Sequence, residues 1–116
     1  MRDFKQLKVW QKAHRLVLAI YQHSKAFPPD QRYGLTAHLL RSATSIPSNI
    51  AEGCGRETDT ELARFLSIAA GSAAETEYQL MLAHDLGFLS KSHHVDLNAQ
   101  VNEVKRMLNA FIQRLS

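Results

Sequence analysis

Apolar residues recur at helical spacing along nearly the whole chain, and the pattern is widest in residues 5–25. One apolar row comprises Leu7, Trp10, His14, Val17 and Tyr21. A second row beside it comprises Val9, Ala13, Leu16 and Ile20. Spacing of three and four residues is typical of one face of an α-helix. The two rows together cover about half of the helix circumference, which is more than a single core contact requires. The surplus apolar face predicts that copies of the chain meet along this first helix.

A second helix is predicted over residues 29–53, after the helix-breaking segment Phe27-Pro28-Pro29. Its inward stripe comprises Leu35, Leu39, Ala43, Ile46 and Ile50. Pro47 lies inside this helix and has no N–H, so it removes one backbone hydrogen bond and predicts a bend. A full break at Pro47 is the alternative. We expect Gly53 or Gly55 to supply the left-handed residue that ends the helix.

Capping signals delimit the third helix. Thr58 and Glu61 form an S/T-x-x-E capping box at its start. We expect it to run to Leu86 and to end at Gly87, with Phe88 placed for the apolar contact of a Schellman motif. Its middle, residues 69–74, consists of Ala, Gly and Ser, and small side chains let a neighbouring helix approach closely. The region around Ala43 and Pro47 of the second helix is the predicted neighbour.

The fourth helix is predicted to start near Ser90 or Ser92. Its apolar positions step by four and three in alternation, namely Leu97, Val101, Val104, Leu108, Phe111 and Leu115. This is a heptad seam. No segment alternates with a period of two, so no strand is predicted. Long amphipathic helices with short connections favour an all-α fold, an antiparallel up-down four-helix bundle with a proline-kinked second helix. The length of 116 residues predicts a single domain over residues 1–116.

Composition limits the class of protein further. Apolar residues make up 45% and charged residues 22% of the chain, as in ordinary globular domains. Cys54 is the single cysteine, so no internal disulfide forms and a reducing compartment is favoured. Neither a signal peptide nor an apolar run of membrane-spanning length is visible. We therefore expect a cytoplasmic protein that does not cross a membrane.

The charges are distributed unevenly. Residues 1–26 carry six Lys or Arg against one Asp, whereas residues 58–89 carry one Arg against five acidic residues. Lys5, Lys8, Lys12 and Arg15 share one side of the first helix, and His23 continues that line, with no Asp or Glu four residues away to neutralise it. Two interpretations stay open. The row contacts the phosphates of RNA or DNA, or it is solvated or faces the acidic third helix of another copy.

No residue set points to a catalytic reaction, so we expect neither an enzyme nor a cofactor. A di-iron bundle needs Glu-x-x-His motifs, and none occurs. His93, His94 and Asp96 could ligate a metal, but adjacent histidines point to different faces of a helix, so only one of them would align with a given partner. Arg32 and His38 have the loose spacing of the Arg–His pair in small helical ribonucleases, which leaves a ribonuclease as a further alternative. Cys54, with no activating neighbour, is interpreted as a structural residue.

The segment from Ser45 to Arg56 carries a family resemblance. Together with Phe27-Pro28, Tyr33-Gly34-Leu35, Arg41, Phe65-Leu66, Gly71-Ser72, Glu75 and Leu86-Gly87, it resembles the four-helix proteins encoded within 23S ribosomal RNA intervening sequences. The resemblance extends from Phe4 to the C-terminus. It implies a homopentameric ring with no established enzymatic activity. The same family includes accessory proteins of diversity-generating retroelements, so it also implies nucleic acid and a reverse transcriptase as partners.

We expect structural roles for several residues of the family motif. The motif positions are Arg41, Pro47, Asn49, Glu52, Gly53, Arg56, Gly71 and Glu75. We expect Asn49 and Glu52 to bond the backbone freed by Pro47 or to line a surface of the ring, and Glu75 to pair with Arg41 or Arg56. His14 is expected to be a buried, satisfied histidine. The predicted function is thus a homo-oligomeric scaffold or adaptor that contacts nucleic acid through its first helix, and the resemblance implies that the oligomer is a pentamer. A protein-interaction ring lacking nucleic acid is the main alternative.

Overall fold

The computed structural model describes residues 2–116, which form four α-helices and two short 3-10 helices. The elements are η1 (Phe4–Gln6), α1 (Lys8–Ser24), η2 (Pro29–Gln31), α2 (Leu35–Cys54), α3 (Asp59–Asp85) and α4 (Lys91–Leu115). Residues 2–116 contain no strand. None of the helices in this range combines the length and the apolarity needed to cross a bilayer.

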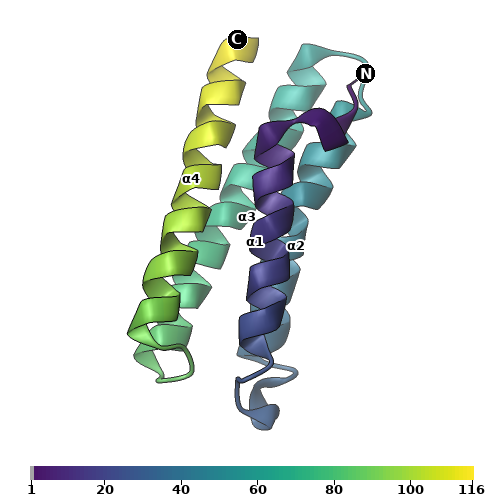
Figure 1. Ribbon diagram of the computed structural model, residues 1–116. Helices are drawn as coiled ribbons and strands as arrows, with labels where there is room; N and C mark the ends of the chain where they lie inside the picture. Colours follow the sequence, from purple (N-terminus) through teal and green to yellow (C-terminus); the bar gives the residue numbers. More distant parts are fainter. Residues whose placement is uncertain (1) are drawn as a thin grey trace.

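The four helices lie side by side in a body of 43 × 24 × 20 Å (Figure 1). α1 packs between α2 and α4, and α3 packs against both α2 and α4. The α1–α2 and α3–α4 connections lie at one end of the molecule, whereas η1, the α2–α3 connection and the end of α4 lie at the other (Figure 1). The bundle therefore encloses one core to which every helix contributes.

The apolar periodicities identify most of this core. The predicted seam of α4 is confirmed from Leu97 to Phe111, and the stripe of α2 is confirmed from Leu35 to Ile50. On α1 the row from Val9 to Ile20 faces the core. The neighbouring row is divided, because Val17 is buried in the core, Trp10 is half-buried, and Tyr21 is 45% exposed. The wide apolar arc of α1 therefore exceeds what the single chain covers.

The first two helices begin later than predicted. Asp3 caps η1 by accepting a hydrogen bond from the Lys5 amide, and Leu7 is then extended, with φ −80° and ψ 127°. α1 consequently starts at Lys8 instead of Lys5. Similarly, Pro29 begins η2, and α2 starts only at Leu35.

Pro47 is buried within an unbroken α2, so the alternative of a full break is wrong. The two glycines near the end of this helix do not act as predicted. Gly55 has a right-handed φ of −83°, and Gly87 is the single glycine in residues 2–116 with a positive φ. Gly53 is instead required for close packing, because a Cβ placed there would lie 2.9 Å from the Phe65 Cβ.

The predicted start of α3 after Thr58 is confirmed, although the Glu61 carboxylate pairs with Arg64 and does not complete the capping box, and of the two predicted starts of α4 the structure selects Ser90. The Thr58 hydroxyl accepts a hydrogen bond from the Glu61 amide, and the Ser90 hydroxyl accepts one from the His93 amide. After α3, Gly87 adopts φ 82°, and the Phe88 amide donates to the Ala83 carbonyl at 2.9 Å. That bond is the six-to-one hydrogen bond of a Schellman motif.

Candidate functional site

The predicted basic row divides into exposed cations and one that is neutralised. Lys8 and Arg15 are exposed on α1, Lys5 is exposed on η1, and none of the three forms an ion pair within residues 2–116. Lys12 is different, since its Nζ lies 3.1 Å from a Glu103 carboxylate oxygen on α4. The expectation of a fully unneutralised row is therefore wrong at Lys12, because its partner comes from another helix.

The histidines of α1 do not belong to the basic row. His23 contacts His93 of α4, with ring centroids 4.3 Å apart. His14 is exposed and stacks on Trp10 at 5.0 Å with an interplanar angle of 7°. The expectation that His14 is buried is wrong, because His14 lies on the outer side of α1 although Val17 of the same row enters the core. His14 instead lies with the half-buried Trp10 and the exposed Leu18 and Tyr21 on the outer apolar face of α1.

Hydroxyl and amide side chains link α2 to α3 where the residues of both helices are small. The Ser45 and Ser72 hydroxyls are 2.8 Å apart, and Asn49 donates to both the carbonyl and the hydroxyl of Ser45. A buried group lies beside them, in which Thr76 donates to Ser42, and Ser42 donates to Gln79. These contacts confirm α2 as the neighbour of the small-residue segment of α3. Asn49 thus bonds Ser45 and not the Ala43 carbonyl, which is the one freed by Pro47.

A polar hollow of about 300 Å³ opens above this contact between α2 and α3. His38, Arg41 and Glu75 line it, together with three serines. The predicted pairing of Glu75 with Arg41 or Arg56 is wrong, because Arg56 pairs with Glu52 at 3.1 Å and Glu75 forms no ion pair within the described residues.

The residues considered for catalysis or metal binding do not converge. Arg32 lines a hollow beside the α1–α2 connection, whereas His38 lines the hollow between α2 and α3. The ribonuclease alternative therefore gains no support. His94 stacks on His84 and His93 contacts His23, so these neighbours face different partners. No group of three or more His, Cys, Asp or Glu that could hold a metal occurs in residues 2–116.

Cys54 is buried, and this burial raises the pKa of its thiol above the usual range. A raised pKa lowers the thiolate fraction at neutral pH, and the thiolate is the reactive form. The interpretation of Cys54 as a structural residue is consistent with this environment.

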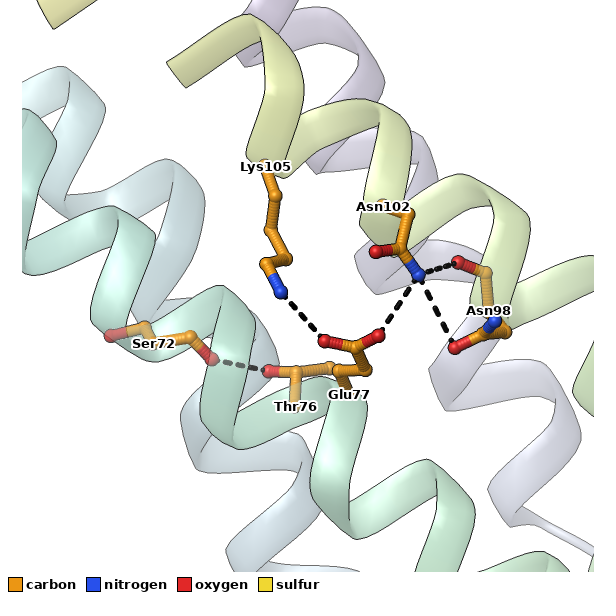
Figure 2. A network of polar contacts seen from close by, with 6 residues as sticks. All are labelled: Ser72, Thr76, Glu77, Asn98, Asn102 and Lys105. Atoms are coloured by element: carbon orange, nitrogen blue, oxygen red, sulfur yellow. Dashed lines mark hydrogen bonds and ion pairs between the residues drawn. The ribbon is translucent and has the colours of Figure 1, made fainter. Parts of the chain in front are cut away.

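A polar network between α3 and α4 was missed by sequence reasoning (Figure 2). Lys105 donates to the Glu77 carboxylate at 2.7 Å, and Asn102 donates to its other oxygen at 3.0 Å. Asn102 also donates to the Asn98 carbonyl one turn earlier. These donors hold the pKa of Glu77 below its ordinary value, the Lys105 hydrogen bond first and the Asn102 bond second. The spacing of Asn98, Asn102 and Lys105 on one side of α4 was the available signal.

Replacing Glu77 with glutamine will lower the free energy of unfolding by about 1 kcal/mol at pH 7, because a charge-assisted pair on a half-buried surface is lost. The folded-state pKa of Glu77 is depressed, so its contribution is complete above the unfolded value near 4.5 and is lost as the pH falls through the folded value. Urea unfolding at pH 7 and at pH 3 measures the loss of unfolding free energy and its dependence on pH. Glu61→Gln, which removes an exposed pair with Arg64, serves as the control and should cost less than about 0.5 kcal/mol. Equal losses for Glu77→Gln at the two pH values would contradict this account.

The sequence and the fold of this chain are similar to those of known proteins. The sequence model of the family described as 23S rRNA-intervening sequence protein matches residues 5–110. A crystal structure of a protein with unknown function from the S23 ribosomal protein family of Bacteroides thetaiotaomicron superposes with a TM-score of 0.84. It is 27% identical and the match covers 90% of this chain and 97% of that one. No curated protein matches the chain.

Proposed function

This chain belongs to the 23S rRNA-intervening sequence protein family, and on that basis we propose that it is a non-enzymatic helical subunit that assembles with its own copies and contacts RNA or DNA. In this proposal the subunit is an antiparallel up-down bundle, and its copies form a ring. The pentameric state follows from the family resemblance. A reverse-transcriptase partner is implied by the same resemblance and stays a prediction.

The observation that carries the proposal is the exposed surface of α1. Unpaired cations and an unpaired apolar face occur together on this one helix. Leu18 is 56% exposed and Tyr21 is 45% exposed, and they continue the row that contains Trp10 and His14. Exposed apolar surface of this kind marks contact sites for other proteins. Self-association through this face would leave Lys8 and Arg15, which are exposed outside the apolar row, as a repeated basic surface.

Phosphate contact is the chemistry that this basic surface supports. Lys5, Lys8 and Arg15 supply positive charge, and no exposed carboxylate pairs with them within residues 2–116. Such contacts position a nucleic-acid backbone without reading its bases. We therefore expect binding that depends strongly on salt and weakly on sequence.

The double substitution Lys8→Glu/Arg15→Glu will weaken binding of a short single-stranded RNA at least tenfold, because two phosphate contacts are replaced by repulsion. Each lost contact should also reduce the slope of log affinity against log salt by about 0.7. Fluorescence anisotropy measures both quantities. Salt should be varied between about 50 and 200 mM, because affinity for nucleic acid falls steeply over this range. Lys12 is omitted because Glu103 already neutralises it.

The matched control is Lys91→Glu/Arg106→Glu, which changes the net charge equally at exposed α4 positions outside the basic row. It should reduce affinity far less. RNA affinity that survives Lys8→Glu/Arg15→Glu would exclude the phosphate-contact proposal. Light scattering on the same samples tests assembly, since a persistent mass of 13.1 kDa would contradict self-association.

A protein-interaction ring without nucleic acid is the second candidate. It is favoured by Glu75 and Asp85, exposed acidic residues of α3 that form no ion pair within residues 2–116. In that arrangement the cations of α1 contact α3 of a neighbouring copy. The assembly mass would then fall as salt rises, and added RNA would leave it unchanged. RNA degraded by the unsubstituted protein, and spared by His38→Ala, would instead indicate the ribonuclease alternative.

A further inference from the structure

A hollow of about 500 Å³ lies between the start of α1 and the end of α4. It arises because α1 begins only at Lys8, whereas α4 continues to Leu115. The segment before α1 turns away from α4 toward α2 (Figure 1), where the Arg2 amide donates to the Cys54 carbonyl at 2.9 Å. α1 therefore does not extend alongside the last turns of α4.

The base of the hollow is apolar. Val9 of α1 and Phe111 of α4, both more than nine-tenths buried, lie beside Met107 and the exposed Ala110. One turn from the hollow, toward the middle of the bundle, the Lys12–Glu103 pair joins α1 to α4. The hollow thus has apolar walls, and its volume is in the range of sites that bind small molecules.

The rim of the hollow is cationic. Arg2, Lys8 and Arg114 line it, and no carboxylate does. The guanidinium groups of Arg2 and Arg114 lie 5.8 and 5.3 Å from the centre of the Phe111 ring. Arg2 has a distant partner in Asp59 at 3.6 Å, whereas Lys8 and Arg114 form no ion pair within residues 2–116. The rim therefore offers two unpaired cations above an apolar surface.

We propose that this hollow binds a soluble anionic amphiphile, a molecule with an apolar acyl or aromatic body and one carboxylate or phosphate head. The body would lie against Leu7, Met107 and Ala110, above the buried Val9 and Phe111, and burial of this apolar surface would supply most of the affinity. The head would receive hydrogen bonds from Lys8 and Arg114, which are stronger than neutral ones because both partners are charged. A neutral amphiphile would leave these cations without an anion, so the site discriminates by charge. This site is separate from the proposed nucleic-acid contact, although Lys8 belongs to both.

Calorimetric titration with dodecanoate, kept below its micelle-forming concentration, tests the proposal. Dodecanoate should bind at least tenfold more tightly than dodecyl maltoside, which has the same chain and a neutral head. Arg114→Glu should weaken dodecanoate binding at least tenfold, because one charge-assisted bond is lost and a repulsive charge is added. Ala110→Trp should abolish binding by filling the hollow. Arg106→Glu, an exposed charge reversal on the same helix outside the hollow, should leave the affinity unchanged.

Four results would overturn the proposal, the last of them being no dodecanoate binding to the unsubstituted chain. The first is equal affinity for the anionic and the neutral amphiphile, and the second is dodecanoate binding that is unchanged in Arg114→Glu. The third is that the chain binds phosphatidylglycerol vesicles instead of dodecanoate, with the same affinity in Ala110→Trp. That result would mean that the cations contact a membrane surface. A loss of assembly mass in Ala110→Trp, with no dodecanoate binding to the unsubstituted chain, would show that a second copy fills the hollow. RNA affinity retained by Ala110→Trp separates this site from the proposed nucleic-acid contact, so either can fail alone.

Discussion

Replacing Leu66 with alanine will lower the free energy of unfolding by about 3 kcal/mol, which is the largest loss we expect from a single side-chain truncation in this chain. Leu66 lies on α3 with none of its surface exposed. The substitution removes apolar contacts and leaves a cavity that the surrounding helices fill only in part, so both terms destabilise the fold. For a domain of this size the melting temperature should fall by roughly 10–20 °C. Urea unfolding followed by circular dichroism measures the loss.

Met81→Ala is the control for that measurement. Met81 lies on the same helix but is 46% exposed, so its truncation removes little buried surface. We expect a loss below about 1 kcal/mol. Similar losses for Leu66→Ala and Met81→Ala would mean that α3 does not present Leu66 to the core, and the packing of this helix would have to be revised.

Replacing Gly53 with alanine will destabilise the protein by about 1–2 kcal/mol, although alanine is the better helix former. A Cβ at position 53 would lie 2.9 Å from the Phe65 Cβ and 3.3 Å from the Leu62 carbonyl oxygen. Both atoms belong to or adjoin the backbone of α3, so they move only if the helix moves. The cost of such overpacking, about 1–3 kcal/mol, exceeds the gain of about 1 kcal/mol in helix propensity only where the overlap is severe, as it is here.

Gly71→Ala is the matched control, because Gly71 is also inside a helix but has nothing within 4 Å of the position of a Cβ. It should gain about 0.5–1 kcal/mol from helix propensity alone. Opposite signs for the two glycine substitutions, measured by chemical denaturation, are the expected result. A stabilised Gly53→Ala protein would contradict the close approach of α2 and α3.

Local features of this protein could be predicted because their causes lie within a few residues. Thr58 and Ser90 cap helices that begin directly after them, and Gly87 ends a helix that has just passed. The seam of α4 is similarly local, because its period alone determines which side is apolar. The family motif around Pro47 also includes the region where Ser45, which accepts a hydrogen bond from Asn49, contacts Ser72 and so joins α2 to α3.

The candidate sites were predicted less well, because their residues meet across helices. Lys12 has no acidic residue four positions away in the sequence, but Glu103 pairs with it from α4. Glu77 attracted no attention in the sequence, yet it joins α3 to α4 through Lys105 and Asn102. The hollow beside Phe111 depends on where α1 begins relative to the end of α4, and a linear sequence does not contain that offset.

The sequence by itself determined that the chain is helical, where α3 and α4 begin, and which face of α2 and α4 is apolar, because backbone propensity, caps and periodicity act over one or two turns. Only the tertiary structure decided that Val17 enters the core while His14 and Tyr21 of the same row stay outside it, that Gly53 serves packing instead of helix termination, and which cations stay unpaired. These outcomes depend on the distances between helices, and such distances are set when all four helices pack together.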